Sequence, residues 1–118
     1  MNSLMLNNIH FPLVNSFTAY KNYVLSIPNL SEEEERDLLS NFKLNNCLKS
    51  ANTLILSQLK TVVFLAHQYR NYGLSEEDLV QEGNIGLMKA VKNFDINQKV
   101  RLYTYAILWI KAEMQSFI

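Results

Sequence analysis

Residues 78–94 read DLVQEGNIGLMKAVKNF, and the spacing of their side chains decides the fold class. At about 100° per residue the apolar side chains gather on one arc of a helix, which is typical of a helix that packs on a core. That arc consists of Leu79, Val80, Leu87, Ala90, Val91 and Phe94. Ile85 is the exception, because it falls in the middle of the opposite, polar arc, beside Asp78 and Glu82.

The same helical period recurs in the rest of the chain. Only three glycines and two prolines occur among 118 residues, too few for the many turns of a β-sheet protein. We therefore expect an all-α fold, a helical bundle of about five helices. The expected helices cover residues 16–27, 31–42, 47–72, 75–93 and 102–118. Residues 1–15 are expected to form a loosely ordered arm, residues 16–46 short helices, and residues 47–118 the main helical domain.

Several helix ends are marked by characteristic residues. Ser31 and Glu34 have the spacing of a capping box, and the acids at 32–35 are expected to cap this helix and stay solvated. Gly73 is the expected C-cap of the long helix, and Ser75 starts the next one.

Two glycines lie inside the helix at 75–93, where glycine costs up to about 1 kcal/mol relative to alanine. Gly83 and Gly86 fall on the same side as the apolar arc. Small residues on that side let another helix approach closely, and the helix at 47–72 is the expected neighbour.

Composition describes one globular domain, in which 48% of the residues are hydrophobic and 19% are charged. The single cysteine cannot form an internal disulfide, and no apolar run reaches the roughly 18 residues that span a bilayer. The first residues lack the basic and apolar regions of a signal peptide. We expect a cytoplasmic protein without a membrane partner.

Charge is balanced overall but unevenly distributed. The net charge of zero argues against a free-standing nucleic-acid binder. Residues 1–85 carry a net charge of −3, however, and residues 86–118 carry +3. An acidic first part and a basic end suggest two surfaces with different partners.

The sequence contains no catalytic constellation. His10 and His67 stand alone, and Cys47 has no obvious base near it. The motifs that bind metals or cradle phosphates are missing. We expect no enzymatic activity, no cofactor and no metal site.

The exposed isoleucine allows two interpretations. Ile85 with Met88, ringed by Asp78, Gln81, Glu82 and Asn84, has the composition of a small interface, with an apolar centre inside a polar, acidic rim. A partner helix with basic residues would fit it. The alternative is chance exposure of one apolar side chain, which is ordinary in soluble proteins.

The last helix also carries a second face. Its expected core stripe is Ala106, Ile107, Ile110, Met114 and Phe117, and Tyr103 is expected to point inward. Tyr105 and Trp109, four residues apart, lie off that stripe and near Lys99, Arg101 and Lys111. They fit a stacking platform for unpaired bases, with the basic residues holding phosphates. A half-buried aromatic patch of the bundle is the alternative.

The residues that carry these two features resemble a known family. DLVQEGNIGLMKAVKNFD (78–95) followed by RLYTYAILWIKAE (101–113) resembles region two of the bacterial RNA polymerase sigma factors of the sigma-70 family. The resemblance extends from about residue 20 to the end of the chain. The residues of the last helix are more similar to those of the heat-shock class of sigma factors than to those of the housekeeping class. It implies a transcription initiation factor that catalyses no covalent reaction.

The resemblance implies a partner for each surface. The polar helix face would dock on the clamp-helix coiled coil of the β′ subunit of core RNA polymerase, through Asp78, Gln81, Glu82, Asn84, Ile85 and Met88. The aromatic helix would bind promoter DNA, on the non-template strand of the minus-ten element. Tyr105 would stack on a flipped adenine, and Trp109 would prop the edge of the melted duplex. The implied DNA-binding residues are Lys99, Arg101, Thr104, Tyr105, Leu108, Trp109, Lys111, Ala112 and Gln115.

Two departures from the family pattern affect the expected activity. Leu108 stands where family members often carry an aromatic residue or histidine, which weakens the platform. The sequence stops at Ile118, inside the helix that reads the upstream edge of the minus-ten element, so we expect a truncated sigma factor. A second interpretation is therefore a regulatory module that docks on polymerase without opening promoters. An anti-sigma factor or chaperone could be a further partner.

Overall fold

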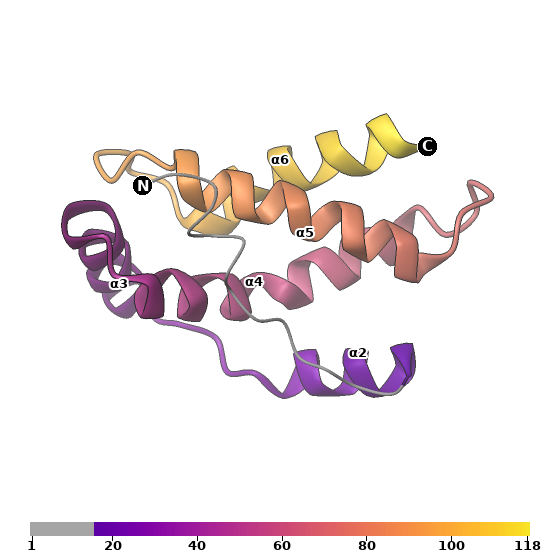
Figure 1. The fold of residues 1–118 in the computed structure, drawn as a ribbon, viewed down its shortest axis with the longest axis horizontal. Helices are drawn as coiled ribbons and strands as arrows, with labels where there is room; N and C mark the ends of the chain where they lie inside the picture. The colour runs from indigo at the N-terminus through magenta and orange to yellow at the C-terminus, as the bar shows by residue number, and fades with distance from the viewer. Residues whose placement is uncertain (1–15) are drawn as a thin grey trace.

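The computed structural model describes residues 16–118 and confirms the all-α class, with five helices in this part of the chain (Figure 1). The expected arm at residues 1–15, with His10, lies outside the described residues. The helices are α2 (Phe17–Ser26), α3 (Glu32–Asn45), α4 (Leu48–Gln68), α5 (Glu76–Asn93) and α6 (Leu102–Phe117).

Helix α4 lies at the centre of the bundle, because it contacts each of the other four helices. Four of its apolar side chains are fully buried, Leu54, Ile55, Leu59 and Val62. Helices α5 and α6 run side by side in opposite directions and cover one side of α4, while α2 and α3 contact α4 elsewhere (Figure 1). All five helices contribute to the largest fully buried side chains, and the contribution of α2 is Val24.

Two of the helix starts follow the sequence prediction. The Ser31 hydroxyl accepts the backbone N–H of Glu34 at 3.1 Å, and the Glu34 carboxylate accepts the backbone N–H of Ser31 at 2.9 Å, which completes the capping box. The Ser75 hydroxyl accepts the backbone N–H of Asp78 at 3.1 Å and caps α5. Both caps satisfy amides that have no partner within the helix.

The predicted end of the long helix was wrong. Helix α4 ends at Gln68, because the next backbone N–H groups turn to carbonyls three residues back: Tyr69 bonds to Ala66 and Arg70 to His67. These tighter bonds end the helix before Gly73 is reached. Gly73 has a φ of +87° and lies in the connection to α5, where it serves the turn and not the helix end.

The predicted neighbour of the two helix glycines was only partly right. A Cβ on Gly86 would lie 2.5 Å from the carbonyl oxygen of Trp109 and 2.9 Å from the Cα of Ile110, so the backbone that approaches it belongs to α6. A Cβ on Gly83 would meet side chains from both α4 and α6, those of Val62 and Met114. The glycines therefore bring α6 close to α5, and α4 shares only the contact at Gly83.

Two predictions about α6 side chains were also wrong. Phe117 is 44% exposed instead of lying in the core, and Tyr103 is 47% exposed instead of pointing inward. The buried side chains of α6 are Leu102, Ala106, Ile110 and Met114, with Ile107 half-buried. The buried stripe is thus one turn nearer the start of the helix than the sequence suggested.

Candidate functional site

The outer face of α5 carries the exposed isoleucine that the sequence predicted. Ile85 is 38% exposed, and the nearby Asp78 and Gln81 are also exposed. Glu82 and Asn84 are half-buried, and Met88 packs partly against the core. We call these six residues the α5 face. It presents an apolar centre beside carboxylates, which is the composition of an interface.

Helix α2 reaches one edge of the α5 face, a contact that no pattern in the sequence predicts. The Asn84 side-chain amide donates to the Tyr20 hydroxyl at 3.4 Å, and Lys21 lies 4.0 Å from Glu76. Burial raises the pKa of Tyr20. These contacts join residues more than fifty positions apart, so only the folded chain reveals that α2 borders this surface.

Phe94 and the backbone of Asn93 hold the aromatic pair of α6, Tyr105 and Trp109, in place. The rings of Tyr105 and Trp109 lie 6.1 Å apart at 52°, and the ring of Phe94 meets Tyr105 edge-on at 5.3 Å. The Tyr105 hydroxyl donates to the backbone carbonyl of Asn93 at 3.3 Å. Both rings of the pair are half-buried and pack against the core, so their remaining surface is held in a fixed orientation.

The other residues predicted near the aromatic pair lie in varied surroundings. Leu108 is 68% exposed, and Lys99, Thr104 and Ala112 are exposed as well. Lys111 is half-buried. The exposed Gln115 donates from its amide to the Tyr69 hydroxyl at 2.9 Å, which ties α6 to the end of α4. The α6 face, as we call Lys99 and the predicted residues from Thr104 to Gln115, thus combines aromatic, apolar and basic side chains.

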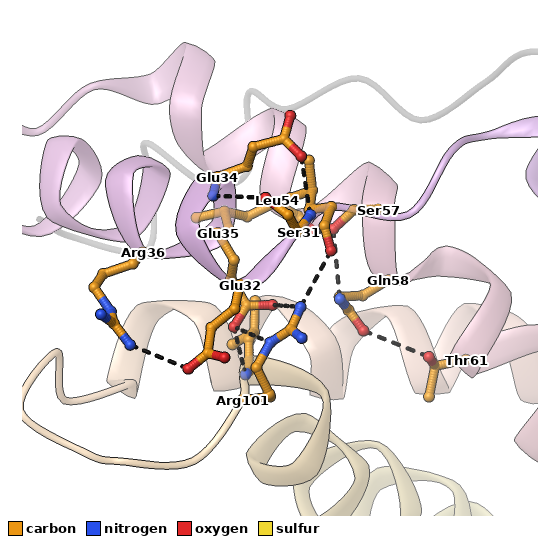
Figure 2. Close-up of polar contacts among 12 residues, drawn as sticks. Ser31, Glu32, Glu34, Glu35, Arg36, Leu54, Ser57, Gln58, Thr61 and Arg101 are labelled. Atoms are coloured by element: carbon orange, nitrogen blue, oxygen red, sulfur yellow. Dashed lines mark hydrogen bonds and ion pairs between the residues drawn. The ribbon is translucent and has the colours of Figure 1, made fainter.

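Arg101 is engaged within the protein (Figure 2). Its Nε donates to Oε2 of Glu35 at 3.1 Å, and its Nη2 donates to Oε1 of Glu35 at 3.3 Å and to the carbonyl of Leu30 at 3.2 Å. The hydrogen bond with Glu35 raises the pKa of Arg101. These bonds engage three of the five guanidinium N–H groups, those of Nε and Nη2.

The prediction that Glu35 is exposed to solvent was wrong. Glu35 was expected to stay solvated with the other acids of its run, but it is only 3% exposed. The four successive glutamates look alike in the sequence. On helix α3, however, the last of them faces inward, toward α6. A helical wheel of residues 32–45 places it on the same side as Leu39 and Phe42, which was the available signal.

The described part of the chain places its single histidine beside a carboxylate. His67 is not isolated as the sequence suggested, since its Nδ1 lies 3.0 Å from Oε1 of Glu76, and the histidine side chain is exposed. Among residues 16–118, no three His, Cys, Asp or Glu side chains gather where they could hold a metal ion.

Residues 54–118, which include most of α4 and the whole of α5 and α6, match the family described as Sigma-70 region 2. The chain belongs to the sigma-70 family. A curated relative, the RNA polymerase sigma-C factor of Myxococcus xanthus, is 39% identical over 108 residues. That alignment covers 92% of this chain and 36% of the relative, so the chain spans about a third of the relative's length.

The match to sigma region 2 includes both candidate surfaces. The α5 face and the α6 face lie inside residues 54–118, whereas α2 and α3 precede the matched segment. Within residues 16–118, no helix of this sigma region is long and apolar enough to cross a bilayer.

Proposed function

We propose that the chain acts in transcription initiation as the part of a sigma factor that binds core RNA polymerase through the α5 face and the promoter strand through the α6 face, without catalysing a reaction. The observation that supports this most directly is Ile85, exposed at the centre of an acidic and amide rim in a chain that belongs to the sigma-70 family.

The chemistry of the α5 face fits a basic helical partner. Asp78 and Glu82 present carboxylates that would attract basic side chains of the β′ clamp helices and raise the association rate. Ile85 and the exposed part of Met88 would fill the apolar centre, where burial contributes about 25 cal/mol for each Å² removed from water. Gln81 and Asn84 would complete the polar rim.

The docking proposal is tested by changing the centre and the rim separately. Ile85→Asp buries an unpaired charge in the interface, and Glu82→Lys sets like charges against each other, so each should lower the affinity for core polymerase at least tenfold. The measurement is co-elution of the purified chain with core polymerase on a sizing column at low salt.

Matched controls exist elsewhere on the surface. Leu44→Asp makes the same kind of change at a more exposed leucine on α3, and Asp37→Lys reverses a carboxylate on that helix. Both controls should co-elute normally. Equal loss from a control and its matched variant would contradict docking through the α5 face.

The chemistry of the α6 face fits single-stranded DNA. Tyr105 and Trp109 offer held aromatic surface for stacking on bases, which contributes about 1–3 kcal/mol for each base. Lys99 and Lys111 can contact phosphates, and Thr104, Leu108, Ala112 and Gln115 border the platform. We leave Arg101 out of the direct contacts, because Glu35 and Leu30 bind three of its five guanidinium N–H groups and fix its orientation toward α3.

The DNA proposal is tested on the complex of the chain with core polymerase. Tyr105→Ala should weaken binding of a fluorescent non-template strand of the minus-ten element about tenfold or more, and Trp109→Ala should do the same. Tyr105→Phe keeps the ring and loses only the hydroxyl bond to Asn93, so it should bind nearly as the parent does.

If both alanine variants bind the strand as the parent does, the DNA proposal fails. The function would then be that of a module that docks on polymerase without opening promoters. The membership in the heat-shock class and the anti-sigma or chaperone partner stay predictions from the sequence resemblance.

A further inference from the structure

The start of α6 lacks a cap of its own. Arg101 occupies the N-cap position, and its side chain makes no capping bond to α6. The first turn also contains no acidic residue. A helix start without a side-chain cap leaves several backbone N–H groups unpaired, and a buried start cannot use water instead. The fully buried Leu102 is the first residue of the helix, so its N–H needs a partner from the protein.

That partner is a carboxylate from another helix. Oε2 of Glu35 accepts the backbone N–H of Leu102 at 3.0 Å, across 67 positions of sequence. The same carboxylate receives both bonds from the Arg101 guanidinium (Figure 2). Glu35 thus accepts three hydrogen bonds from two consecutive residues of α6, and its negative charge lies at the positive end of the α6 dipole.

The carboxylate itself is held firmly. Glu35 lies in the first turn of α3, whose start is fixed by the capping box of Ser31 and Glu34 just before it (Figure 2). Arg101 is bound at the same time to the carbonyl of Leu30, in the segment that leads into α3. Glu35 and the carbonyl of Leu30 therefore both bind the start of α6, and these contacts lie where α3 and α6 meet.

The contact between Glu35 and the start of α6 lies close to the aromatic residues of the α6 face. Tyr105 lies one turn after Leu102 on the same helix, and Trp109 lies one turn further. A tilt or fraying of the first turn would move the Tyr105 ring away from Phe94, on which it rests at 5.3 Å. The Glu35 bond therefore holds the turn of α6 that directly precedes the aromatic pair.

We propose that Glu35 is a positioning residue for strand binding: it caps α6 in trans, binds the Arg101 guanidinium through two N–H groups, and thereby fixes the aromatic platform. This inference rests on the proposed function of the α6 face. It assigns a role in that function to α3, which precedes the segment matched by the sigma family. Arg101 has a structural role in this arrangement and is not a phosphate contact.

The experiment compares Glu35→Gln with Glu33→Gln, an exposed glutamate in the same turn. The full chain is bound to core polymerase, and two affinities are measured: that for the polymerase and that for the fluorescent non-template strand. Glu35→Gln should weaken strand binding five- to tenfold while polymerase affinity stays within twofold of the parent. Glu33→Gln should leave both unchanged. Strand binding unchanged or strengthened in Glu35→Gln overturns the proposal.

A second measurement separates positioning from direct contact. Each Lys or Arg that binds a phosphate contributes about one unit to the slope of log affinity against log salt. Arg101→Gln should weaken strand binding with an unchanged salt slope, because no phosphate contact is lost, whereas Lys111→Gln should reduce the slope. A reduced slope in Arg101→Gln would show that Arg101 reaches the DNA and would overturn the proposal.

Loss of folding and failure of the wider function can both be recognised. Amide hydrogen exchange of the free chain should show faster exchange at the first turn of α6 in Glu35→Gln, with the first turn of α5 protected as in the parent. Faster exchange throughout the chain would make Glu35 a general stability residue and would overturn the positioning role. If Tyr105→Ala lowers strand affinity but Glu35→Gln does not, only this inference fails. If Tyr105→Ala has no effect either, the proposed function fails with it.

Discussion

Helices α5 and α6 carry the two candidate surfaces, yet they begin in opposite ways. Helix α5 starts with Ser75, whose hydroxyl bonds to the N–H of Asp78, and three acids fill its first turn. Helix α6 starts with Arg101, has no acid in its first turn, and receives its carboxylate from Glu35 on α3. One start is encoded within four residues of sequence, and the other depends on a residue 67 positions away.

The difference teaches how the two surfaces depend on the rest of the fold. The start of α5 can form wherever its own sequence is present, because cap and helix are contiguous. The start of α6 exists only after α3 has packed beside it. The α6 face should therefore respond to changes in α3 and in the loop that leads to it, whereas the first turn of α5 should not.

The largest expected effect comes from breaking the contact that holds the two helices together. Gly86→Ala would place a Cβ against the backbone of Trp109 and Ile110, which cannot move aside as a flexible side chain can. We expect a loss of about 2–3 kcal/mol in unfolding free energy despite the better helix propensity of alanine. Urea unfolding of the 118-residue chain measures it.

Gly83→Ala is the matched control, because the three nearest atoms to its Cβ would be side-chain atoms of Met114, Val62 and Ile110 and not backbone. It should destabilise the chain clearly less than Gly86→Ala. Equal losses would contradict the conclusion that the α6 backbone sets the spacing at Gly86.

The next largest effect is expected from substitutions that give α6 a local cap like that of α5. Glu35→Ala alone should cost about 2 kcal/mol, since it leaves Arg101 and the Leu102 amide without their carboxylate. In an Arg101→Ser background, a hydroxyl at the N-cap can serve the first turn locally, so the same Glu35→Ala change should cost at least 1 kcal/mol less. A double-mutant cycle by urea unfolding gives the coupling. Additive losses would mean that the two residues do not act together.

A smaller loss is expected from removing the local cap of α5. Ser75→Ala should cost about 1 kcal/mol, the usual value for an N-cap hydroxyl. Ser116→Ala, which loses an exposed hydroxyl bond near the end of α6, should change stability by less than about 0.5 kcal/mol. In hydrogen exchange, fraying in Ser75→Ala should be confined to the first turn of α5; fraying that spreads to α6 would contradict the independence of the two starts.

The smallest effect concerns the capping box that holds α3, and through it the α6 start. Hydrogen bonds from the backbone and hydroxyl of Ser31 lower the pKa of Glu34 below its ordinary value of 4.5. A lowered folded-state pKa stabilises the protein above the unfolded-state pKa, and this contribution is lost as the pH falls through the folded-state value. The stability difference between the parent and Glu34→Gln should therefore shrink as the pH falls below 4.5. A difference that is independent of pH would contradict this linkage.

The sequence determined the parts of the protein that depend on short-range pattern. The period of residues 78–94 predicted the buried side of α5 and the exposure of Ile85, and the Ser31 and Ser75 caps were readable because cap and helix are contiguous. The family was also readable from two short stretches. These features need only the geometry of a single helix, which repeats from one protein to the next.

Only the tertiary structure decided how the helices meet and what that meeting does to individual side chains. It placed α6 against Gly86, paired the Glu35 carboxylate with the start of α6, engaged Arg101 internally and turned Tyr103 outward. Each of these outcomes depends on a contact between residues distant in sequence, and the pattern of one helix cannot say which neighbour will cover it. The physical reason is that a buried amide or guanidinium must find a partner in space, and the chain topology determines which partner is within reach.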